Sequence, residues 1–441
     1  MVLGFHGAPG GRTDRRPGAV RSTAGRCVRS GAPMDARQPR RRPQGRSAGR
    51  HGPGAALELP WQSAVVDLPR PEIDPGGLLE YSVVFTDRSL NHMSQRLVAV
   101  MQDIVDVLRM TYRAETVAVV PGGGTFAMEA VARQLATGRR CLVVRNGLFS
   151  YRWSQIFEVG AIPAETQVCR ARPVSDEQHA PWAPPPIDEV VEAIERSRPD
   201  VVFAAHVETA SGLLLPDDYI RALAAATHEV GGLVVLDCIA SGSLWVDMTD
   251  LGIDVLLSAP QKGWSGSPCA GFVMLSEPGR EAVESTTSTS FAADLRTWLM
   301  ITEAYVDGRT PYHVTLPTDT LAHDAALMRQ TYDTGLDELR EAQVALGTLV
   351  RRLLAQRGFP SVATEGFDAP SVVVAFTDDP AIRSGAKFRQ VGVQVAAGVP
   401  LMCGEGNDFS TFRIGLFGLD KLADVDGTVG RLESRLDQLD R

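Results

Sequence analysis

The sequence has no run of 18 or more consecutive apolar residues, so it predicts no membrane-spanning helix. Cysteine is sparse and scattered, without a C-x-x-C pair or a cysteine–histidine cluster. Because zinc sites need closely spaced ligands and disulfide frameworks need paired cysteines, this spacing predicts reduced thiols, a cytoplasmic setting and no metal site. The six cysteines are Cys27, Cys141, Cys169, Cys238, Cys269 and Cys403.

Acidic residues are almost absent from the first 52 positions, which hold twelve arginines and only Asp14 and Asp35. The whole chain carries a net charge of −9, so the remainder is acidic and does not suit duplex nucleic acid as a partner. Residues 1–55 also lack apolar periodicity, and we predict a disordered basic extension there. A targeting peptide, a nucleic-acid tail and a start codon at Met34 or later are alternative interpretations of this stretch.

The rest of the chain has an ordinary composition, and its length allows two or three domains. Residues 56–98 are predicted to form an N-terminal arm. Uniformly apolar strands then alternate with helices, a pattern typical of a mainly parallel sheet sandwiched by helices. We therefore predict an α/β fold, with a large domain at 99–317 and a smaller α+β domain at 318–441 that begins with a long connecting helix. The expected strands are 116–120, 141–144, 201–205, 233–237, 254–258, 271–275, 371–376 and 412–416.

Three glycines lie at a predicted strand-to-helix turn, in Pro121-Gly122-Gly123-Gly124-Thr125. Free backbone N–H groups at a helix N-terminus bind anions, and glycine lets a phosphate approach the backbone closely. The stretch matches neither G-x-G-x-x-G nor a Walker A motif, so a plain tight turn is the competing interpretation.

Two ionisable residues follow the ends of buried strands further along the chain. Asp237 ends one apolar strand, and Lys262 follows another, within Ser258-Ala-Pro-Gln-Lys-Gly-Trp264. The carboxyl ends of neighbouring parallel strands meet at one crevice, so the two side chains are expected to converge there. A partly desolvated lysine has a lowered pKa and can act as nucleophile or base. A phosphate cradle, a buried carboxylate and a strand-end lysine together predict pyridoxal 5'-phosphate as cofactor, with Lys262 forming a Schiff base and Asp237 pairing with the ring nitrogen.

The chain also resembles a known family, the class V, fold-type I pyridoxal-phosphate aminotransferases of the alanine–glyoxylate and serine–pyruvate group. The resemblance covers about residues 90–441 and rests on eight short stretches in the same order. These are Asn91–Ser94, Gly122–Thr125 with Met128–Ala130, Asn146–Phe149, His206–Gly212, Asp237–Ser241, Gln261-Lys262, Tyr312–Pro317 and Phe412–Gly418. It implies transfer of an amino group from a small amino acid of the alanine or serine type to a small 2-oxo acid, glyoxylate or pyruvate, by a ping-pong mechanism.

The resemblance also implies a role for each matching residue. Lys262 would hold the cofactor and move a proton at the substrate Cα, and Asp237 would keep the ring nitrogen protonated. The phosphate would be bound by Gly123, Gly124, Thr125 and Gln261.

Four further residues match positions around the cofactor ring and phosphate. Phe149 would stack on the ring, unless it is a core residue, and Thr209 would bond the phenolic oxygen. Tyr312 and Thr315 match residues that reach the phosphate of the neighbouring subunit, which implies a homodimer with shared active sites.

Arg413 is the predicted substrate-binding residue. It interrupts the apolar run Phe412–Leu416 and needs an anionic partner if it is buried. A substrate carboxylate would supply one through a bidentate pairing, and a structural ion pair is the competing interpretation.

Two departures from the family concern the substrate. The Gly-Pro-Gly-Pro segment that usually lines the active-site entrance is replaced by residues 75–81, Pro-Gly-Gly-Leu-Leu-Glu-Tyr. Trp264, two residues after the lysine, is expected close to the reacting centre, where it would affect specificity.

Two other functions use the same residues. One is a pyridoxal-phosphate lyase or cysteine desulfurase on this fold. Cys403 resembles a desulfurase nucleophile, but desulfurases usually place histidine before the lysine, where this chain has Gln261. A non-catalytic binding protein is the third class, and the joint presence of Lys262, Asp237 and Arg413 argues against it.

Overall fold

The computed structural model describes residues 68–439, so the predictions for residues 1–55 and for residues 56–67 of the arm lie outside the described residues. The helices are α1 (Gln95–Tyr112), α2 (Gly124–Leu135), α3 (Leu148–Gly160), α4 (Ile187–Ser197), α5 (Asp217–Glu229), α6 (Met248–Leu251), α7 (Glu277–Glu284), α8 (Leu295–Val306), α9 (Thr318–Thr334), α10 (Leu336–Gln356), α11 (Pro380–Arg383), α12 (Ala386–Gln390), α13 (Leu419–Leu422) and α14 (Val425–Leu436). The strands are β1 (Thr116–Pro121), β2 (Arg140–Arg145), β3 (Glu165–Arg170), β4 (Arg172–Pro173), β5 (Trp182–Ala183), β6 (Val201–Ala205), β7 (Val207–Glu208), β8 (Leu213–Leu214), β9 (Leu233–Asp237), β10 (Val255–Ser258), β11 (Ala270–Leu275), β12 (Val372–Phe376), β13 (Ala396–Ala397) and β14 (Thr411–Gly415).

The central sheet has seven strands in the order β1-β11-β10-β9-β6-β2-β3. The strands from β10 through β9, β6 and β2 to β3 pair in parallel, which confirms the predicted α/β fold with a mainly parallel sheet. Strand β11 is the exception, because it pairs antiparallel with both β10 and β1. Residues 259–269, which join β10 to β11 and carry Lys262, are too few for a crossover helix, so the chain turns back on itself.

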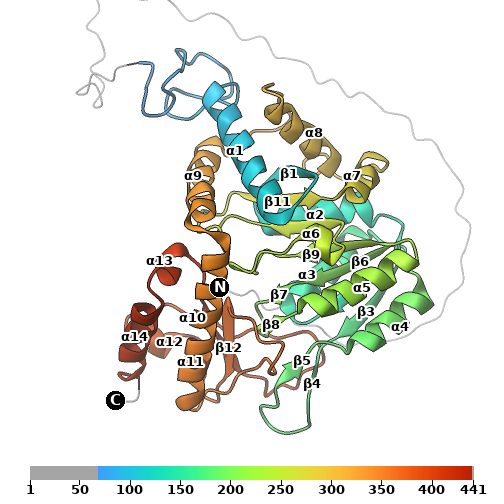
Figure 1. Cartoon of the computed structure of the whole chain (residues 1–441), viewed down its shortest axis with the longest axis vertical. Coiled ribbons are helices and arrows are strands. Elements are labelled where there is room, and N and C mark those ends of the chain that lie inside the picture. The colour runs from blue at the N-terminus through green and yellow to red at the C-terminus, as the bar shows by residue number, and fades with distance from the viewer. Residues whose placement is uncertain (1–67, 440–441) are drawn as a thin grey trace, which may run out of the picture. The chain divides into compact units, whose positions relative to one another are not determined.

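Helices cover both faces of this sheet, as Figure 1 shows. Helices α4 and α5 pack together over one face, and α2 and α3 pack together over the other. Strand β3 was not predicted, because at the sheet edge its side chains are partly or fully exposed and lack the apolar signature of the inner strands.

The small domain is built on the antiparallel sheet β12-β14-β13, against which α10 packs. The predicted single helical region 318–356 is wrong in detail, since it breaks into α9 and α10 at Gly335. Gly335 has φ +106°, a conformation that side-chain-bearing residues rarely adopt, and the sequence pattern on either side is helical. The C-terminal helical stretch is also divided, into α13 and α14, where the Asp424 side chain accepts the Gly427 N–H.

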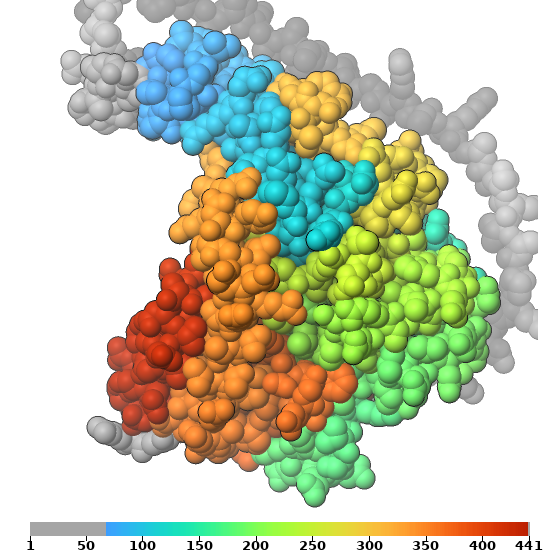
Figure 2. Space-filling view, in the orientation of Figure 1, coloured from blue at the N-terminus to red at the C-terminus, as the bar shows by residue number. Residues whose placement is uncertain are grey.

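Apolar side chains form separate cores in the two parts of the chain. The largest core draws on the central sheet and on helices from α1 to α9. A second core lies between α10, the small sheet and α14. The domain boundary near residue 317 stays a prediction, because α9 packs in the large core and the second core begins with α10. Figure 2 shows the surface of α9 and α10 (orange) alongside the large domain.

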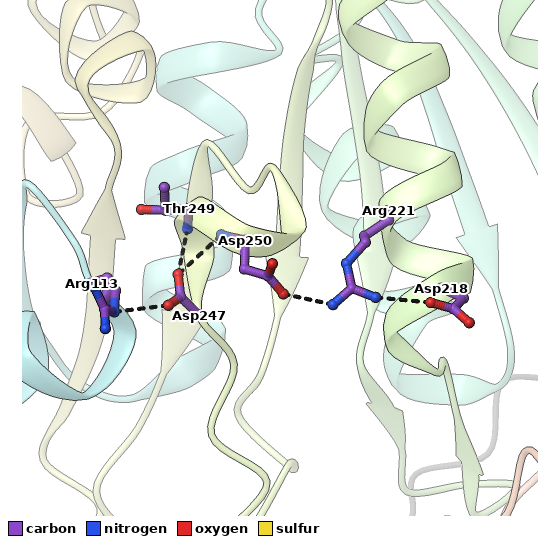
Figure 3. A network of polar contacts seen from close by, with 6 residues as sticks. All are labelled: Arg113, Asp218, Arg221, Asp247, Thr249 and Asp250. Atoms are coloured by element: carbon purple, nitrogen blue, oxygen red, sulfur yellow. Dashed lines mark hydrogen bonds and ion pairs between the residues drawn. The ribbon is translucent and has the colours of Figure 1, made fainter.

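A chain of surface ion pairs fixes the turn between β9 and β10 (Figure 3). Asp247 pairs with Arg113 at 2.8 Å and caps α6 by accepting the Asp250 backbone N–H at 3.0 Å. The Asp250 carboxylate pairs at 2.6 Å with Arg221 of α5, which also contacts Asp218. Exposed pairs contribute little stability one by one, but together they hold this turn between α1 and α5.

Within residues 68–439, no helix has the length and apolar character that a membrane crossing requires. The same described residues contain no group of three or more histidine, cysteine or acidic side chains placed to hold a metal ion.

Candidate active site

The segments that carry most of the predicted site residues converge where the parallel strands of the central sheet have their carboxyl ends. Strands β1, β6, β9 and β10 run in the same direction, so their carboxyl ends share this edge. Asp237 is the last residue of β9 and stands beside Leu257 of β10 and Ala205 of β6 in the register. Lys262 follows β10, and the glycine-rich turn follows β1. The crevice expected at the ends of parallel strands is therefore where these residues meet.

Lys262 is one of only three lysines in the chain. Lys387 is paired with Asp379, and Lys421 donates to the Phe417 carbonyl at 2.8 Å. Within the described residues, Lys262 Nζ has no hydrogen bond or ion pair and instead lies 4.8 Å from the centre of the Phe417 ring. Burial lowers the pKa of Lys262, and the positive charge of Arg413 lowers it further. Lys262 is thus a partly desolvated amine that is free to react.

Asp237 is buried, with 7% of its surface exposed. Its carboxylate accepts the Ile239 backbone N–H at 2.9 Å. Burial raises the pKa of Asp237 to about 6, while the positive charges of Arg152 and Lys262 act in the opposite direction. A nearby cation stabilises the ionised form of a buried carboxylate. A protonated ring nitrogen would be such a cation.

The glycine-rich turn ends in an open helix N-terminus. Gly123, the residue before α2, has φ +146°, and an added Cβ there would meet no atom within 4 Å. An added Cβ at Gly124 would lie 2.5 Å from Ile239, the neighbour of Asp237, so glycine is needed for this close packing. No side chain caps α2, which leaves its first N–H groups facing space that an anion can fill.

Arg152 is a site residue that the sequence analysis missed. It lies on α3, and its guanidinium donates to Thr125 Oγ1 at 2.9 Å and lies 5.0 Å from the centre of the Phe149 ring. The available signal was its position three residues after Phe149, one helical turn away on the same face. It places a second positive charge beside the glycine-rich turn.

Glu208 was also missed, and it fixes the start of α3. Its carboxylate accepts the backbone N–H of Phe149 at 3.1 Å and that of Ser150 at 2.8 Å. It also accepts the Ala210 N–H at 2.9 Å. An added Cβ at Gly147 would lie 2.6 Å from Glu208, so the Asn-Gly pair before α3 leaves room for this carboxylate. Glu208 thereby sets where the Phe149 ring lies.

Arg413 lies on β14 and reaches the same phenylalanine from the small domain. Its Nε donates to the Ala397 carbonyl at 2.9 Å, and its guanidinium lies 5.6 Å from the centre of the Phe149 ring. Burial lowers the pKa of Arg413, and the carboxylate of Glu208 acts in the opposite direction. The competing interpretation, a structural ion pair, finds no partner in contact with Arg413 among residues 68–439.

The remaining predicted residues fall into two groups. Gln261 is partly buried beside Lys262, and its Oε1 is buried without a hydrogen-bond partner in the described chain. Thr209 is buried next to Glu208. Tyr312 and Thr315 are exposed and contact each other at 3.4 Å, and no contact joins them to Lys262 in the described chain.

Trp264 does not line the reacting centre, so the expectation of a direct effect on specificity is wrong. It is fully buried, stacks on Trp245 at 4.5 Å between ring centres, and donates from Nε1 to Ser258 Oγ at 3.3 Å. Tyr112 donates to the same oxygen at 3.3 Å. Trp264 therefore anchors the Lys262 loop in the core and ties it to the end of β10.

We expect Trp264→Ala to lower the free energy of unfolding by about 3–5 kcal/mol, because it leaves a cavity beneath the lysine loop. Urea denaturation of the cofactor-loaded protein measures this loss. Phe291→Ala is the matched control, since 75% of that side chain is exposed and its loss is expected to change stability by less than ~1 kcal/mol. Equal stability of the Trp264 variant and the control would contradict the anchoring role.

The residues of this edge fit pyridoxal phosphate. The uncapped start of α2 suits its phosphate, and the buried Asp237 suits its ring nitrogen. Lys262 supplies the unpaired amine that the carbonyl of the cofactor requires.

Comparisons with known proteins agree with this fit. No family model matches the chain. A 2-aminoethylphosphonate–pyruvate transaminase from Burkholderia pseudomallei is 30% identical over 363 residues, which cover 80% of this chain and 90% of that protein.

Solved structures show the same fold. An aspartate aminotransferase of subgroup IV from Thermus thermophilus has a TM-score of 0.64 at 25% identity, covering 80% of this chain and 93% of that one. An alanine–glyoxylate aminotransferase from Nostoc sp. has a TM-score of 0.67 at 21% identity, covering 79% of this chain and 89% of that one. The fold is that of the fold-type I pyridoxal-phosphate enzymes.

The chain belongs to the class V pyridoxal-phosphate aminotransferases. It is accordingly an enzyme that uses pyridoxal phosphate to transfer amino groups between amino and 2-oxo acid substrates. This confirms the predicted family, cofactor and reaction type, and it leaves the roles of single residues and the identity of the substrates as proposals.

Proposed function

We propose that this aminotransferase moves an amino group from a small amino acid of the alanine or serine type to a small 2-oxo acid, pyruvate or glyoxylate. The observation that carries the proposal is Arg413. Its guanidinium contacts no acidic side chain among residues 68–439, and its charge acts on the Lys262 amine. A substrate carboxylate bound to Arg413 would bring the adjacent Cα toward Lys262. The small donor side chain follows from the resemblance to the alanine–glyoxylate and serine–pyruvate group.

Each residue has one task in this proposal. Pyridoxal phosphate, when bound, supplies a reactive carbonyl carbon and a ring that withdraws negative charge from the substrate Cα. Lys262 Nζ, whose pKa is lowered by burial, would take the proton from the substrate Cα and deliver it to the former carbonyl carbon of the cofactor. Asp237 holds the proton on the ring nitrogen, and Gly123, Gly124, Thr125 and Gln261 bind the phosphate. Phe149 and Thr209 orient the ring.

A small phosphonate is the second candidate amino donor. The Burkholderia relative is named for 2-aminoethylphosphonate and pyruvate. In this chain, Arg152 and Arg413 both lie over the Phe149 ring, at 5.0 and 5.6 Å from its centre. If both guanidinium groups reach the same substrate group, they suit two negative charges better than a single carboxylate.

A donor panel separates these possibilities. Purified enzyme is offered alanine, serine or 2-aminoethylphosphonate with glyoxylate or pyruvate, and the visible absorbance of the cofactor is followed with each donor alone. The proposal predicts that alanine or serine converts the cofactor fastest and that initial rates follow ping-pong kinetics. A higher kcat/KM for 2-aminoethylphosphonate would replace the proposed donor. Ammonia or sulfide release without a keto acid would overturn transamination.

We expect Arg413→Ala to raise KM for the carboxylate substrate by about 100-fold, because a bidentate charge-assisted pairing is lost. Visible absorbance of bound cofactor should remain. Arg389→Ala, at an exposed arginine of α12, is the matched control and is expected to leave KM unchanged. Loss of cofactor from the Arg413 variant with an unchanged KM would contradict the carboxylate role.

The proposal extends to assembly and compartment. Tyr312 is 55% exposed and Thr315 is also exposed, although the family places both at a phosphate site. We propose that they complete the site of a second copy in a cytoplasmic homodimer. Mixing Lys262→Ala subunits with Tyr312→Ala subunits should restore part of the activity, since hybrid dimers would contain one intact site.

The geometry of Cys403 gives no support to the desulfurase alternative. Burial raises the pKa of its thiol to about 12, and Sγ lies 3.4 Å from the Arg145 carbonyl. Glu405 accepts the backbone N–H groups of Met402 and Cys403, both at 2.9 Å, which holds the loop in a tight turn. A desulfurase nucleophile needs the opposite, a thiolate on a mobile loop.

A further inference from the structure

A cavity of about 250 Å³ lies between the large domain and α10, apart from the lysine site. The large domain contributes the end of β8 and residues 244–246, which directly precede the ion-paired turn of Figure 3. Helix α10 contributes Arg340, Val344 and Thr348. Lys262, Asp237, Arg413 and the glycine-rich turn do not line the cavity, so it is a separate site.

Most of the cavity wall is apolar. Leu215, Leu244 and Val246 are buried on the large-domain side, and Val344 faces the cavity from α10. A ligand that fills this space therefore needs a small aliphatic body. The volume is far too small for a nucleotide or a peptide and suits a molecule of a few heavy atoms.

One cation at the cavity has no partner. Arg340 is exposed and makes no hydrogen bond or ion pair within residues 68–439. The other arginine of the wall, Arg351, pairs with Asp368 at 3.0 Å and donates to the Ala369 carbonyl at 2.7 Å. Arg340 is therefore the charge that remains to bind an anion.

Unpartnered donors accompany Arg340. Trp245 Nε1 and Arg351 Nε are buried without hydrogen-bond partners in the described chain, and both side chains line the cavity. His206 also lines the cavity, where burial and then the charge of Arg340 lower its pKa to about 4, so the ring is neutral. Buried donors without acceptors are costly, and this part of the wall is therefore rich in donors and poor in acceptors.

Charge balance sets how much negative charge the ligand can carry. Asp217, in the first turn of α5, also lines the cavity, and the Asp368 carboxylate is occupied by Arg351. One unpaired cation close to one carboxylate favours a singly charged ligand over a dianion such as phosphate. We propose that this cavity binds a small aliphatic monocarboxylate, as a second ligand site distinct from the active site.

The cavity is connected to the active site through His206. Its backbone N–H donates to the Asp237 carbonyl at 2.9 Å, and its Nδ1 contacts Ser241 Oγ at 2.8 Å, in the loop that follows Asp237. A ligand bound between His206 and Arg340 thus contacts two elements at once. One is His206, which is hydrogen-bonded to Asp237, and the other is the connecting helix α10. Its occupancy is expected to change the rate of transamination without competing with the substrate.

Calorimetric titration with butyrate tests the proposal, since butyrate has neither an amino nor a keto group and cannot be turned over. The cofactor-loaded Arg413→Ala protein is used, so that the substrate site does not contribute. Butyrate is expected to bind, and adding Arg340→Ala should weaken binding at least tenfold, or about 1.4 kcal/mol. Arg352→Ala, at another exposed arginine of α10, is the matched control and should leave the affinity within twofold.

Three results would overturn the assignment. They are absence of butyrate binding through the millimolar range, equal affinity after Arg340→Ala, and tighter binding of inorganic phosphate than of butyrate. Because Arg340 is exposed, its replacement is not expected to disturb folding, and urea denaturation of the variant checks this.

Discussion

Replacing Lys262 with alanine is expected to lower kcat by about 10,000-fold, the largest effect of any single change in the chain. The reason is that no second amine can take its place, since Lys387 and Lys421 are engaged elsewhere. Lys387→Ala is the matched control, because that lysine forms an ion pair with Asp379 on the surface. Rates of cofactor conversion with the preferred donor measure the loss.

Borohydride reduction gives a second readout that does not depend on turnover. It should fix pyridoxal phosphate covalently on the wild-type protein and on Lys387→Ala, but not on Lys262→Ala. Peptide mapping is simple, because the chain has only three lysines. A reducible adduct that persisted in the Lys262 variant would show that the assignment of the cofactor lysine is wrong.

The second large effect is expected for Asp237→Asn, with kcat lowered on the order of 100- to 1000-fold. An amide is neutral and cannot hold the proton of the ring nitrogen, so the ring loses its electron-withdrawing charge. Cofactor affinity should fall as well, which equilibrium dialysis measures. Asp254→Asn is a comparison at another buried carboxylate, one that contacts His228 instead of the site, and it should change stability more than kcat.

The same variant should alter the pH dependence of stability in the cofactor-free protein. Burial raises the pKa of Asp237 from 3.8 to about 6. A raised carboxyl pKa stabilises the folded state below pH 3.8, and this contribution is lost as the pH rises through 6. Relative to Asp237→Asn, the wild type should therefore lose about 3 kcal/mol of unfolding free energy between pH 4 and pH 7. Urea titrations that give parallel pH profiles would contradict the burial of an ionisable carboxyl.

The residues that sequence reasoning placed correctly at one edge are those at the ends of strands. Asp237 and Lys262 follow uniformly apolar runs, and parallel strands bring their carboxyl ends together whatever the loops do. The glycine-rich turn was predicted at this place for the same reason, because it follows the apolar strand β1. The antiparallel course of β11 was not visible, because a fully buried strand has the same apolar pattern in either direction.

The residues that were missed act through contacts between distant segments. Glu208 binds the start of α3 from nearly sixty positions away, and nothing in its local pattern separates it from a surface acid. Trp264 was misplaced because a tryptophan beside a reactive lysine has the same sequence context whether it faces the core or the substrate. Its partners Trp245 and Tyr112 come from other parts of the chain.

The scarcity of lysine has a practical consequence for work on the cofactor-free enzyme. Lys262 has a pKa lowered by burial and no ion-pair partner in the described chain, so near neutral pH it is the lysine most ready to be acylated. A mild amine-reactive label would then count vacant active sites, and bound pyridoxal phosphate would protect against it. Chemical modification, often the least selective of methods, becomes here a direct assay of cofactor occupancy.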